Sequence, residues 1–541
     1  MPASATSPCD WPMYGHDPAR TMSSACPSAP APSSVIGLHP RWILHTDDVV
    51  TATPTIVDGV VYAGDWSGRF YAVDLATGAL RWSTVLGPKR ADGNADSHTG
   101  AYGTITSSAA VAKVAGRQMI FVGGGGSLYA LDGSNGSVTD ARRVLWRTDL
   151  DPASPTSQGE AESSPVVWPG APGGPVVIVG SDANQASGYA GEGVFAVRAA
   201  TGAVVWHFNP EAYTHHALYG CGNVWSSPAL GLDPANPSPQ RRAVLYFGTA
   251  DCPDNSPAKC PSAGTDPNCP PGKSYDYTKR WQPYAEAIVA VSALDGSPLW
   301  SFQGSAPLNQ NDDDYGPSAQ LFTLPSGQAV VGEASKDGTY AVLDRNSGRP
   351  VWHQAETGNG NLQPGFALGG FIGTTAVTQV GGAPTVFGAS AINTPVTYDP
   401  ATGGTVLQPL PTLLNGLLAM KAFSASTGSP AWSAPEVYAY GPTSAANGVV
   451  YSGSLDGLLR AYDAASGRLL WAFPMGAPVS SGAAITSGAV VIGGGTTESD
   501  AEFKACANLP ASLADICKQT PLSQTINPLS NLGSIAAFSI H

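Results

Sequence analysis

Short strands of alternating apolar and polar residues recur along the chain in pairs, each joined at Thr-Gly or Ser-Gly and ending on tryptophan. Clear copies are FYAVDLATGALRW at Phe70 to Trp82, VFAVRAATGAVVW at Val194 to Trp206 and LLRAYDAASGRLLW at Leu458 to Trp471. Variants of this pattern occupy four further segments: Leu128 to Trp146, Ile288 to Trp300, Thr339 to Trp352 and Leu417 to Trp432. Each copy predicts a β-hairpin whose indole has one repeated packing role.

A further strand precedes each hairpin, as in IVDGVVYAGDWSG and AANGVVYSGSLDG, so one unit holds about four strands, the size of a propeller blade. The two ends of the sequence supply an eighth unit. Pro40 to Thr46 is a tryptophan strand with no hairpin before it, and Ser534 to Ile540 is a strand with no tryptophan after it. We therefore expect an all-β, eight-bladed β-propeller with four-stranded antiparallel blades, the last closed by N- and C-terminal strands.

Composition agrees with one large propeller. The 541 residues include 64 Gly and 47 Pro but only 12% charged residues, which suits many turns and buried strands. Because the repeat is unbroken, residues 1–541 are predicted to form a single domain. Three loops outgrow the repeat and are expected to cap the axial funnel, or else to be solvent-exposed decoration: Gly87 to Thr104, Ala250 to Tyr284 and Gly495 to Ser530.

Charge and cysteine usage limit the partners and the compartment. The net charge of -14, without a basic cluster, argues against nucleic acid as a partner, and no apolar run is long enough to span a bilayer. The even number of cysteines, eight, favours disulfides over structural zinc, with Cys9–Cys26 and Cys506–Cys517 the most local pairs. Met1 is followed directly by Pro-Ala-Ser-Ala, which is not a signal peptide, so we interpret the sequence as a mature secreted or periplasmic protein.

The opening residues and the repeat together resemble a known family. Asp10-Trp11-Pro12-Met13-Tyr14-Gly15-His16-Asp17, with Arg20-Thr21, is similar to the first motif of quinoprotein alcohol dehydrogenases, and the hairpins resemble their tryptophan-docking repeat. The resemblance covers essentially the whole chain. It implies an eight-bladed propeller that holds pyrroloquinoline quinone and calcium in its funnel. Related propellers without quinone act as envelope-assembly scaffolds, so activity must be argued from site motifs.

Lys336, in Ser335-Lys336-Asp337-Gly338, matches the family's cationic residue beside the reactive quinone carbonyl. A cation at this place stabilises the oxyanion that forms when hydride arrives. The competing interpretation is an ordinary turn lysine beside Asp337. The acidic run NQNDDDYGPS from Asn309 to Ser318 resembles the segment that carries the catalytic base, and its candidates are Asp312 and Asp314. An acidic run is otherwise usually a solvated loop.

The segment GCGNVWSSP from Gly220 to Pro228 resembles the stretch that binds quinone, with Trp225 in the place of the stacking tryptophan and Asn223 two residues before it. Asp251 stands where the family has a calcium ligand, and Asp312 is a second candidate. Flat indoles suit a planar quinone, and hard dications prefer oxygen ligands. The alternatives are a core position for Trp225 and a turn position for Asp251.

Several family features are missing or altered. No two cysteines are adjacent, Thr51 or Thr53 stands where an acidic residue is expected, and the early metal-binding glutamate is replaced at best by Asn184 or Glu192. The departures resemble those of a polyvinyl alcohol dehydrogenase-like branch. No CxxCH haem motif occurs, so a separate electron acceptor such as a cytochrome c is expected.

We therefore expect a quinone-dependent oxidoreductase acting on a small or polymeric alcohol. The alternative is a quinone-free propeller that acts as a binding scaffold or as a tailoring enzyme that has reused the funnel.

Overall fold

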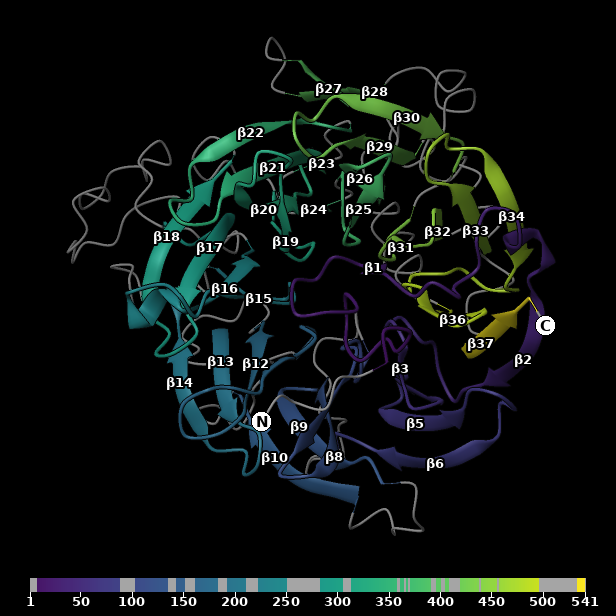
Figure 1. Ribbon diagram of the computed structural model, residues 1–541, viewed down its shortest axis with the longest axis horizontal. Coiled ribbons are helices and arrows are strands. Elements are labelled where there is room, and N and C mark those ends of the chain that lie inside the picture. The colour runs from purple at the N-terminus through teal and green to yellow at the C-terminus, as the bar shows by residue number, and fades with distance from the viewer. Residues whose placement is uncertain are drawn as a thin grey trace.

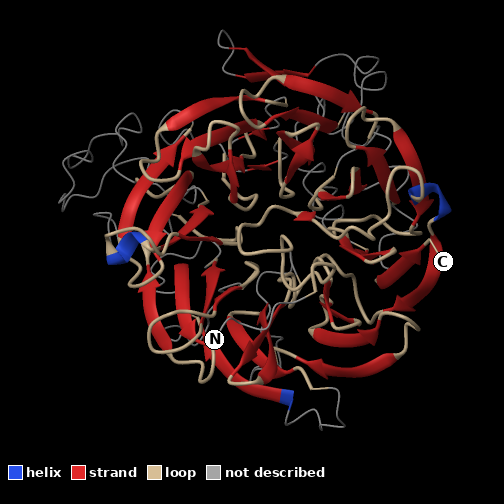
Figure 2. Cartoon of the chain, in the orientation of Figure 1, coloured by secondary structure: helices blue, strands red, loops and turns tan. Residues whose placement is uncertain are grey.

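A computed structural model describes residues 7–87, 103–134, 143–150, 161–182, 192–210, 222–250, 283–304, 313–357, 361–363, 366–367, 370–390, 396–399, 404–407, 419–436, 439–454, 457–495 and 533–540. Its strands form a closed ring of eight blades around one axis, each with four antiparallel strands (Figures 1 and 2). The seventh blade gains a fifth strand, because the short β1 (Ser23–Ser24) pairs in parallel with its innermost strand β31 (Ser444–Ala446). The first strands of neighbouring blades pack against one another around this axis. The predicted all-β, eight-bladed propeller is therefore confirmed.

The strands of each blade are given from the axis outward. The first four blades are β3 (Thr55–Val57), β4 (Val60–Gly64), β5 (Arg69–Asp74), β6 (Leu80–Val85); β7 (Ala110–Val114), β8 (Arg117–Gly124), β9 (Ser127–Asp132), β10 (Val144–Asp149); β11 (Val166–Trp168), β12 (Val176–Ser181), β13 (Gly193–Arg198), β14 (Val204–Phe208); and β15 (Ala229–Leu232), β16 (Ala243–Gly248), β17 (Ala287–Ser292), β18 (Pro298–Gln303).

The last four blades are β19 (Gln320–Thr323), β20 (Ala329–Ala334), β21 (Thr339–Asp344), β22 (Pro350–Ala355); β25 (Ala376–Val380), β26 (Ala383–Ala389), β29 (Met420–Ser424), β30 (Pro430–Ala434); β31 (Ser444–Ala446), β32 (Val449–Gly453), β33 (Leu458–Asp463), β34 (Leu469–Pro474); and β35 (Ala484–Thr486), β36 (Ala489–Gly494), β37 (Ser534–Ser539), β2 (His39–His45). Outside the blades lie hairpins β23 (Asn361–Gln363)–β24 (Phe366–Ala367) and β27 (Val396–Asp399)–β28 (Gly404–Leu407), and 3-10 turns η1 (Val35–Gly37) and η3 (Pro239–Arg241).

The eighth blade joins the two ends of the sequence, as predicted. Strand β37 pairs with β36 on one side and with β2 on the other, and His45 lies opposite Ser534 in the register with β2. The C-terminal strand is thus third from the axis, and β2 supplies the outermost strand. Because both edges of β37 are paired, one β-strand locks the ring.

Tryptophans dock each blade on the next, and this explains their repeat. Within the described residues, seven outer strands carry an indole whose Nε1 donates to a backbone carbonyl of the following blade at 2.9 to 3.1 Å: Trp42, Trp146, Trp206, Trp300, Trp352, Trp432 and Trp471. The receiving turn presents a glycine such as Gly78, whose φ of 73° is left-handed and whose missing Cβ leaves room for Trp42.

The first blade is the exception to this docking. Trp82 Nε1 has no hydrogen-bond partner among the described residues. The Arg143 guanidinium instead lies over the Trp82 ring at 4.1 Å and donates to the carbonyl of Asp132 at 2.9 Å. A cation–π contact therefore takes the place of the indole hydrogen bond here.

A second, inner set of contacts joins the loops that lead into the first strands. Ser108 N donates to Ser164 Oγ, Ser164 N to Ser227 Oγ, Ser227 N to Ser318 Oγ and Ser318 N to Thr374 Oγ1, each at 2.9 Å. Each hydroxyl satisfies a buried backbone N–H of the preceding blade, which would otherwise be costly. These hydrogen bonds were not predicted, although pairs such as Ser107-Ser108 and Ser163-Ser164 recur in the sequence ahead of the inner strands.

The N-terminal segment lies across the centre of the ring (Figure 1). Trp11 exchanges two backbone hydrogen bonds with Ile56 of β3. Carbonyls of this segment accept hydrogen bonds from inner strands of five further blades, at Val111, Leu230, Leu321, Val377 and Ala445. The fully buried Arg20 donates to the carbonyls of Pro228 and Ser164, at 3.0 and 2.8 Å. The segment therefore binds the inner strands together along the axis.

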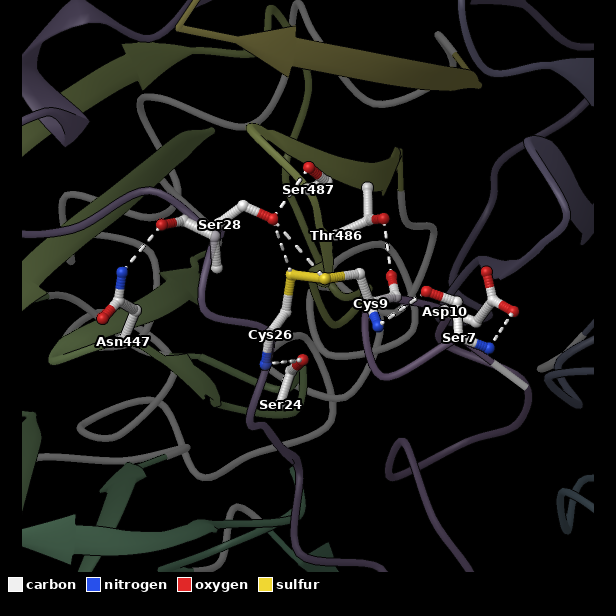
Figure 3. Close-up of a disulfide and its surroundings, with 10 residues drawn as sticks. Ser7, Cys9, Asp10, Ser24, Cys26, Ser28, Asn447, Thr486 and Ser487 are labelled. Atoms are coloured by element: carbon white, nitrogen blue, oxygen red, sulfur yellow. Dashed lines mark hydrogen bonds between the residues drawn. A yellow bond between two sulfur atoms is a disulfide. The ribbon is translucent and has the colours of Figure 1, made fainter. Parts of the chain in front are cut away.

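The predicted disulfide Cys9–Cys26 is present and ties both ends of this segment to the eighth blade (Figure 3). Thr486 Oγ1 donates to the Cys9 carbonyl at 2.6 Å, and Ser28 Oγ donates to Ser487 Oγ at 2.8 Å. The remaining cysteines lie outside the described residues: Cys221, Cys252, Cys260, Cys269, Cys506 and Cys517. Most of the three long loops also lies outside them, so their expected role as a cap stays a prediction.

Candidate functional site

Three of the predicted site residues meet at the end of the axis where the inner strands begin. Trp225 precedes β15, Asp314 precedes β19, and Lys336 lies in the turn between β20 and β21. Asp314 Oδ2 accepts a hydrogen bond from Lys336 Nζ at 2.8 Å and another from Trp225 Nε1 at 3.1 Å. Lys336 Nζ also lies 5.0 Å from the centre of the Trp225 ring. A cation, a carboxylate and an indole thus form one cluster.

The backbone around this cluster holds the side chains in place. Lys336 N donates to the Asp314 carbonyl at 3.0 Å, and Ser335 Oγ donates to the Asp313 carbonyl at 2.9 Å. A Cβ on Gly316 would stand 1.7 Å from the Trp225 ring, so glycine is required where the indole crosses from the fourth blade to the fifth. The turn lysine and the acidic loop are therefore fixed relative to each other.

Burial strengthens the ion pair. The Lys336 and Asp314 side chains are only 13% and 5% exposed. Two donors on one carboxylate oxygen stabilise its charged form, and charge-assisted hydrogen bonds are stronger than neutral ones. The arrangement can hold an ionised carboxylate beside a fixed cation, which is what a general base next to an anion-stabilising group requires.

Glu162 belongs to the same region and was missed by the sequence analysis. It directly precedes Ser163-Ser164 in the third blade, just as Trp225 directly precedes Ser226-Ser227 in the fourth. Burial raises the pKa of Glu162 to about 7, and the nearby charge of Lys336 works against this rise. Glu162 Oε1 is inaccessible to solvent and has no hydrogen-bond partner in the described part of the chain. Its place before a Ser-Ser pair was the signal that could have identified it.

The structure also places Asn223 and Thr51. Asn223 is buried, its carbonyl accepts from Ala250 N at 2.8 Å, and its Oδ1 has no partner among the residues described. Thr51 lies in the first blade, where its Oγ1 accepts a hydrogen bond from Trp66 Nε1 at 2.9 Å.

The predicted metal ligands Asp251, Asp312 and Asn184 lie outside the described residues. Ala250, whose N donates to the Asn223 carbonyl, is the last described residue before Asp251. Glu192 is buried at the start of β13, and its carbonyl contacts His207 Nε2 at 2.5 Å. The described residues contain no group of three His, Cys, Asp or Glu side chains that could hold a metal ion.

Comparison with known proteins places the fold among dehydrogenases. Residues 11–232 match the family model described as the β-propeller domain of glucose, ethanol and alcohol dehydrogenases. The europium-containing methanol dehydrogenase superposes with a TM-score of 0.66 over 98% of both chains, at 16% identity. The chain is therefore similar to quinone-dependent dehydrogenases over its first blades. At 16% identity the superposition itself establishes only the eight-bladed propeller fold.

Curated relatives are distant. Quinohemoprotein alcohol dehydrogenase of Comamonas testosteroni is 24% identical over 88% of this chain and 71% of the relative. Lupanine 17-hydroxylase [cytochrome c] of a Pseudomonas species is 25% identical over 59% of this chain, and the match spans only 43% of that relative. The chain thus matches less than half of the length of the hydroxylase.

A second likeness concerns the C-terminal blades. Residues 417–502 match the family model of the outer membrane protein assembly factor BamB. The structure of BamB from Moraxella catarrhalis superposes with a TM-score of 0.50 at 14% identity, over 93% of this chain. Among the described residues of this chain, no helix is long and apolar enough to cross a membrane.

Proposed function

We propose that this protein is a quinone-dependent oxidoreductase that oxidises an alcohol, with Asp314 as the base and Lys336 as the electrostatic partner. The observation that carries the proposal is the shared contact of Asp314 Oδ2 with Lys336 Nζ and Trp225 Nε1. A surface lysine or a solvated acidic loop would not produce a buried, doubly hydrogen-bonded carboxylate.

Residues of the chain itself can accept the proton that the alcohol hydroxyl loses. Oxidation of an alcohol breaks an O–H bond and a C–H bond, and the Asp314 carboxylate accepts the hydroxyl proton. Lys336 and Trp225 keep Asp314 ionised before this transfer and hold it in one orientation. Lys336 also provides the positive charge that stabilises an oxyanion developing on a bound ligand. Pyrroloquinoline quinone, when bound, would supply the acceptor for the two electrons that leave the alcohol.

The chemical types of the side chains in the cluster suit pyrroloquinoline quinone and calcium. The Trp225 indole is a flat surface for a planar quinone, and the Lys336 ammonium lies 5.0 Å from the centre of its ring. Calcium takes oxygen ligands, and the buried Asn223 Oδ1, without a partner among the described residues, is such an oxygen. Asp251, Asp312 and Asn184 remain proposed metal ligands, and Thr51 a proposed cofactor contact.

The proposal extends to partners and compartment. A cytochrome c is proposed as the separate electron acceptor, because one relative is named lupanine 17-hydroxylase [cytochrome c]. The Cys9–Cys26 disulfide supports a secreted or periplasmic location. A polymeric alcohol, as expected for a polyvinyl alcohol dehydrogenase-like branch, is one proposed substrate class beside small alcohols.

Reconstitution tests this function directly. The protein is titrated with pyrroloquinoline quinone and calcium, followed by the absorption of the quinone, and then assayed for alcohol-dependent reduction of an artificial dye. We expect a saturable spectral change and dye reduction, both weakened in Trp225→Ala. No spectral change at cofactor concentrations that saturate a known quinoprotein would contradict the proposal.

The second candidate is a quinone-free propeller acting as a binding scaffold or as a tailoring enzyme. The match of residues 417–502 to the BamB family model favours the scaffold form. Protein that leaves the quinone spectrum unchanged, but co-purifies in a stable complex when its partners are cross-linked in the envelope, would support this candidate.

A further inference from the structure

Glu162 carries a hydrogen-bonding atom that the proposed chemistry does not use. Its Oε1 is buried and unbonded within the described residues, and the charge of Lys336 lowers its pKa against the effect of burial. Leaving a buried acceptor without a donor costs about 1–3 kcal/mol, and more for a charged group. Such an atom in a candidate site points to a donor that arrives with a ligand.

The neighbouring carboxylate is engaged in a different way. Asp314 Oδ2 already accepts two hydrogen bonds, from Trp225 Nε1 and from Lys336 Nζ. The Lys336 ammonium thus donates to Asp314, whereas Glu162 Oε1 accepts no hydrogen bond among the described residues. The two carboxylates have separate tasks, since one is held by the protein and the other is left open.

The backbone directs Glu162 to the same level of the axis as Trp225. Ala161 N donates to Gly125 O at 2.8 Å, and Val224 N donates to Ser181 O at 3.2 Å, so each loop is held on the blade before it. The Ser164 N to Ser227 Oγ hydrogen bond then joins the two loops directly. Equivalent backbone anchoring places residues 162 and 225 in equivalent positions of adjacent blades.

We propose that Glu162 is a specificity-determining residue that binds a second hydrogen-bond donor of the ligand, a hydroxyl or an ammonium group. The alcohol part of this inference rests on the proposed function. A site that presents an acceptor to a ligand donor rejects analogues that lack the donor, because its buried polar atom then stays unbonded. The preferred ligand is accordingly an alcohol with a second donor group rather than a simple monoalcohol.

Binding of three matched alcohols tests the proposal without turnover. 1-Butanol, 1,4-butanediol and 4-amino-1-butanol are titrated calorimetrically into the full chain at about pH 9, where Glu162, with a pKa of about 7, is ionised. We expect the diol or the amino alcohol to bind at least about tenfold more tightly than 1-butanol, the scale of one hydrogen bond to a charged group. The better of the two identifies the donor as hydroxyl or ammonium.

Variants then assign the preference to Glu162. Glu162→Ala should abolish both preferences, whereas Glu162→Gln should retain part of a hydroxyl preference and lose an ammonium preference. Glu333→Gln is the matched control, because it replaces another buried glutamate, one that faces Gly248 between two blades. Thermal unfolding confirms that each variant is folded.

Equal affinities for the three alcohols in the wild type, or unchanged ratios in Glu162→Ala, would overturn the proposal, as would the absence of any binding. The assay is independent of quinone. A Glu162-dependent preference in a protein that never reduces the dye would therefore refute the proposed function while supporting this inference.

Discussion

At the scale of single residues, the Asp314–Lys336 pair is the feature on which the proposed chemistry depends. Lys336→Ala removes the ammonium that lies 2.8 Å from Asp314 Oδ2. We expect turnover of the reconstituted protein to fall about a hundredfold, a typical loss for one preorganised donor. Steady-state dye reduction measures this, with Lys113→Ala, at an exposed position of β7, as the control. An unchanged rate in Lys336→Ala would assign the lysine no role.

Glu333 is a second residue that differs from its surroundings. It is fully buried in β20, and neither carboxylate oxygen has a partner among the described residues. Three other blades have an apolar residue at the same register, Ala63, Val179 and Phe247, and the seventh blade has the neutral Ser452. Burial raises the pKa of Glu333 well above its ordinary value of 4.5, so this side chain is neutral in the folded protein over a range where it ionises in the unfolded chain.

Because the pKa of Glu333 is higher in the folded than in the unfolded state, this residue lowers the free energy of unfolding as the pH rises. Below about pH 4.5 both states are protonated and Glu333 has no effect, whereas at higher pH only the unfolded state ionises, which lowers stability. Glu333→Gln stays neutral, so its advantage over the wild type should grow with pH by up to about 1.4 kcal/mol per unit above pH 4.5. Urea unfolding at several pH values measures it. A pH-independent difference would show that Glu333 ionises normally.

At the scale of elements, the docked tryptophans hold neighbouring blades together, and the first blade provides an internal comparison. Trp206→Phe removes a hydrogen bond of 3.0 Å and leaves the Ala293 carbonyl without its donor, whereas Trp82→Phe removes no indole hydrogen bond in the described structure. Both variants lose similar aromatic area. We expect Trp206→Phe to cost about 1–2 kcal/mol more free energy of unfolding than Trp82→Phe. Equal losses in chemical denaturation would mean that the hydrogen bond adds nothing to packing.

At the scale of the whole molecule, one strand closes the ring. Deleting residues from Ser534 onward removes β37 and leaves the edges of both β36 and β2 without a partner. We expect insoluble protein, or protein that fails to bind quinone, in solubility and spectral assays. Removing Met1 to Pro8 should be tolerated, because among described residues it costs only the contacts of Ser7 with Asp10 and Cys9. A soluble β37 deletion with an undiminished melting temperature would contradict this account of closure.

Much of the fold followed from the sequence because its determinants are local and repeated. Alternating residues, Thr-Gly or Ser-Gly turns and closing tryptophans define each hairpin within about fifteen residues, and Asp74 illustrates the turn chemistry, since its Oδ1 accepts from Ala76 N and Thr77 N. Counting these units also revealed the incomplete eighth one, and hence the pairing of β37 with β2. Residues such as Trp225 and Lys336 were found because they stand in motifs.

Other features were decided only by the tertiary structure. Which carboxylate meets Lys336 depends on how two loops of the fifth blade lie beside each other, so the sequence alone could not choose between Asp312 and Asp314, and only Asp314 lies in the described residues. Glu162 stands in no motif, and the blade it belongs to brings it toward a lysine 174 positions later. Hydrophobic patterning specifies which faces of strands are buried, but contacts between blades depend on the closed ring, in which residues far apart in sequence share one axis.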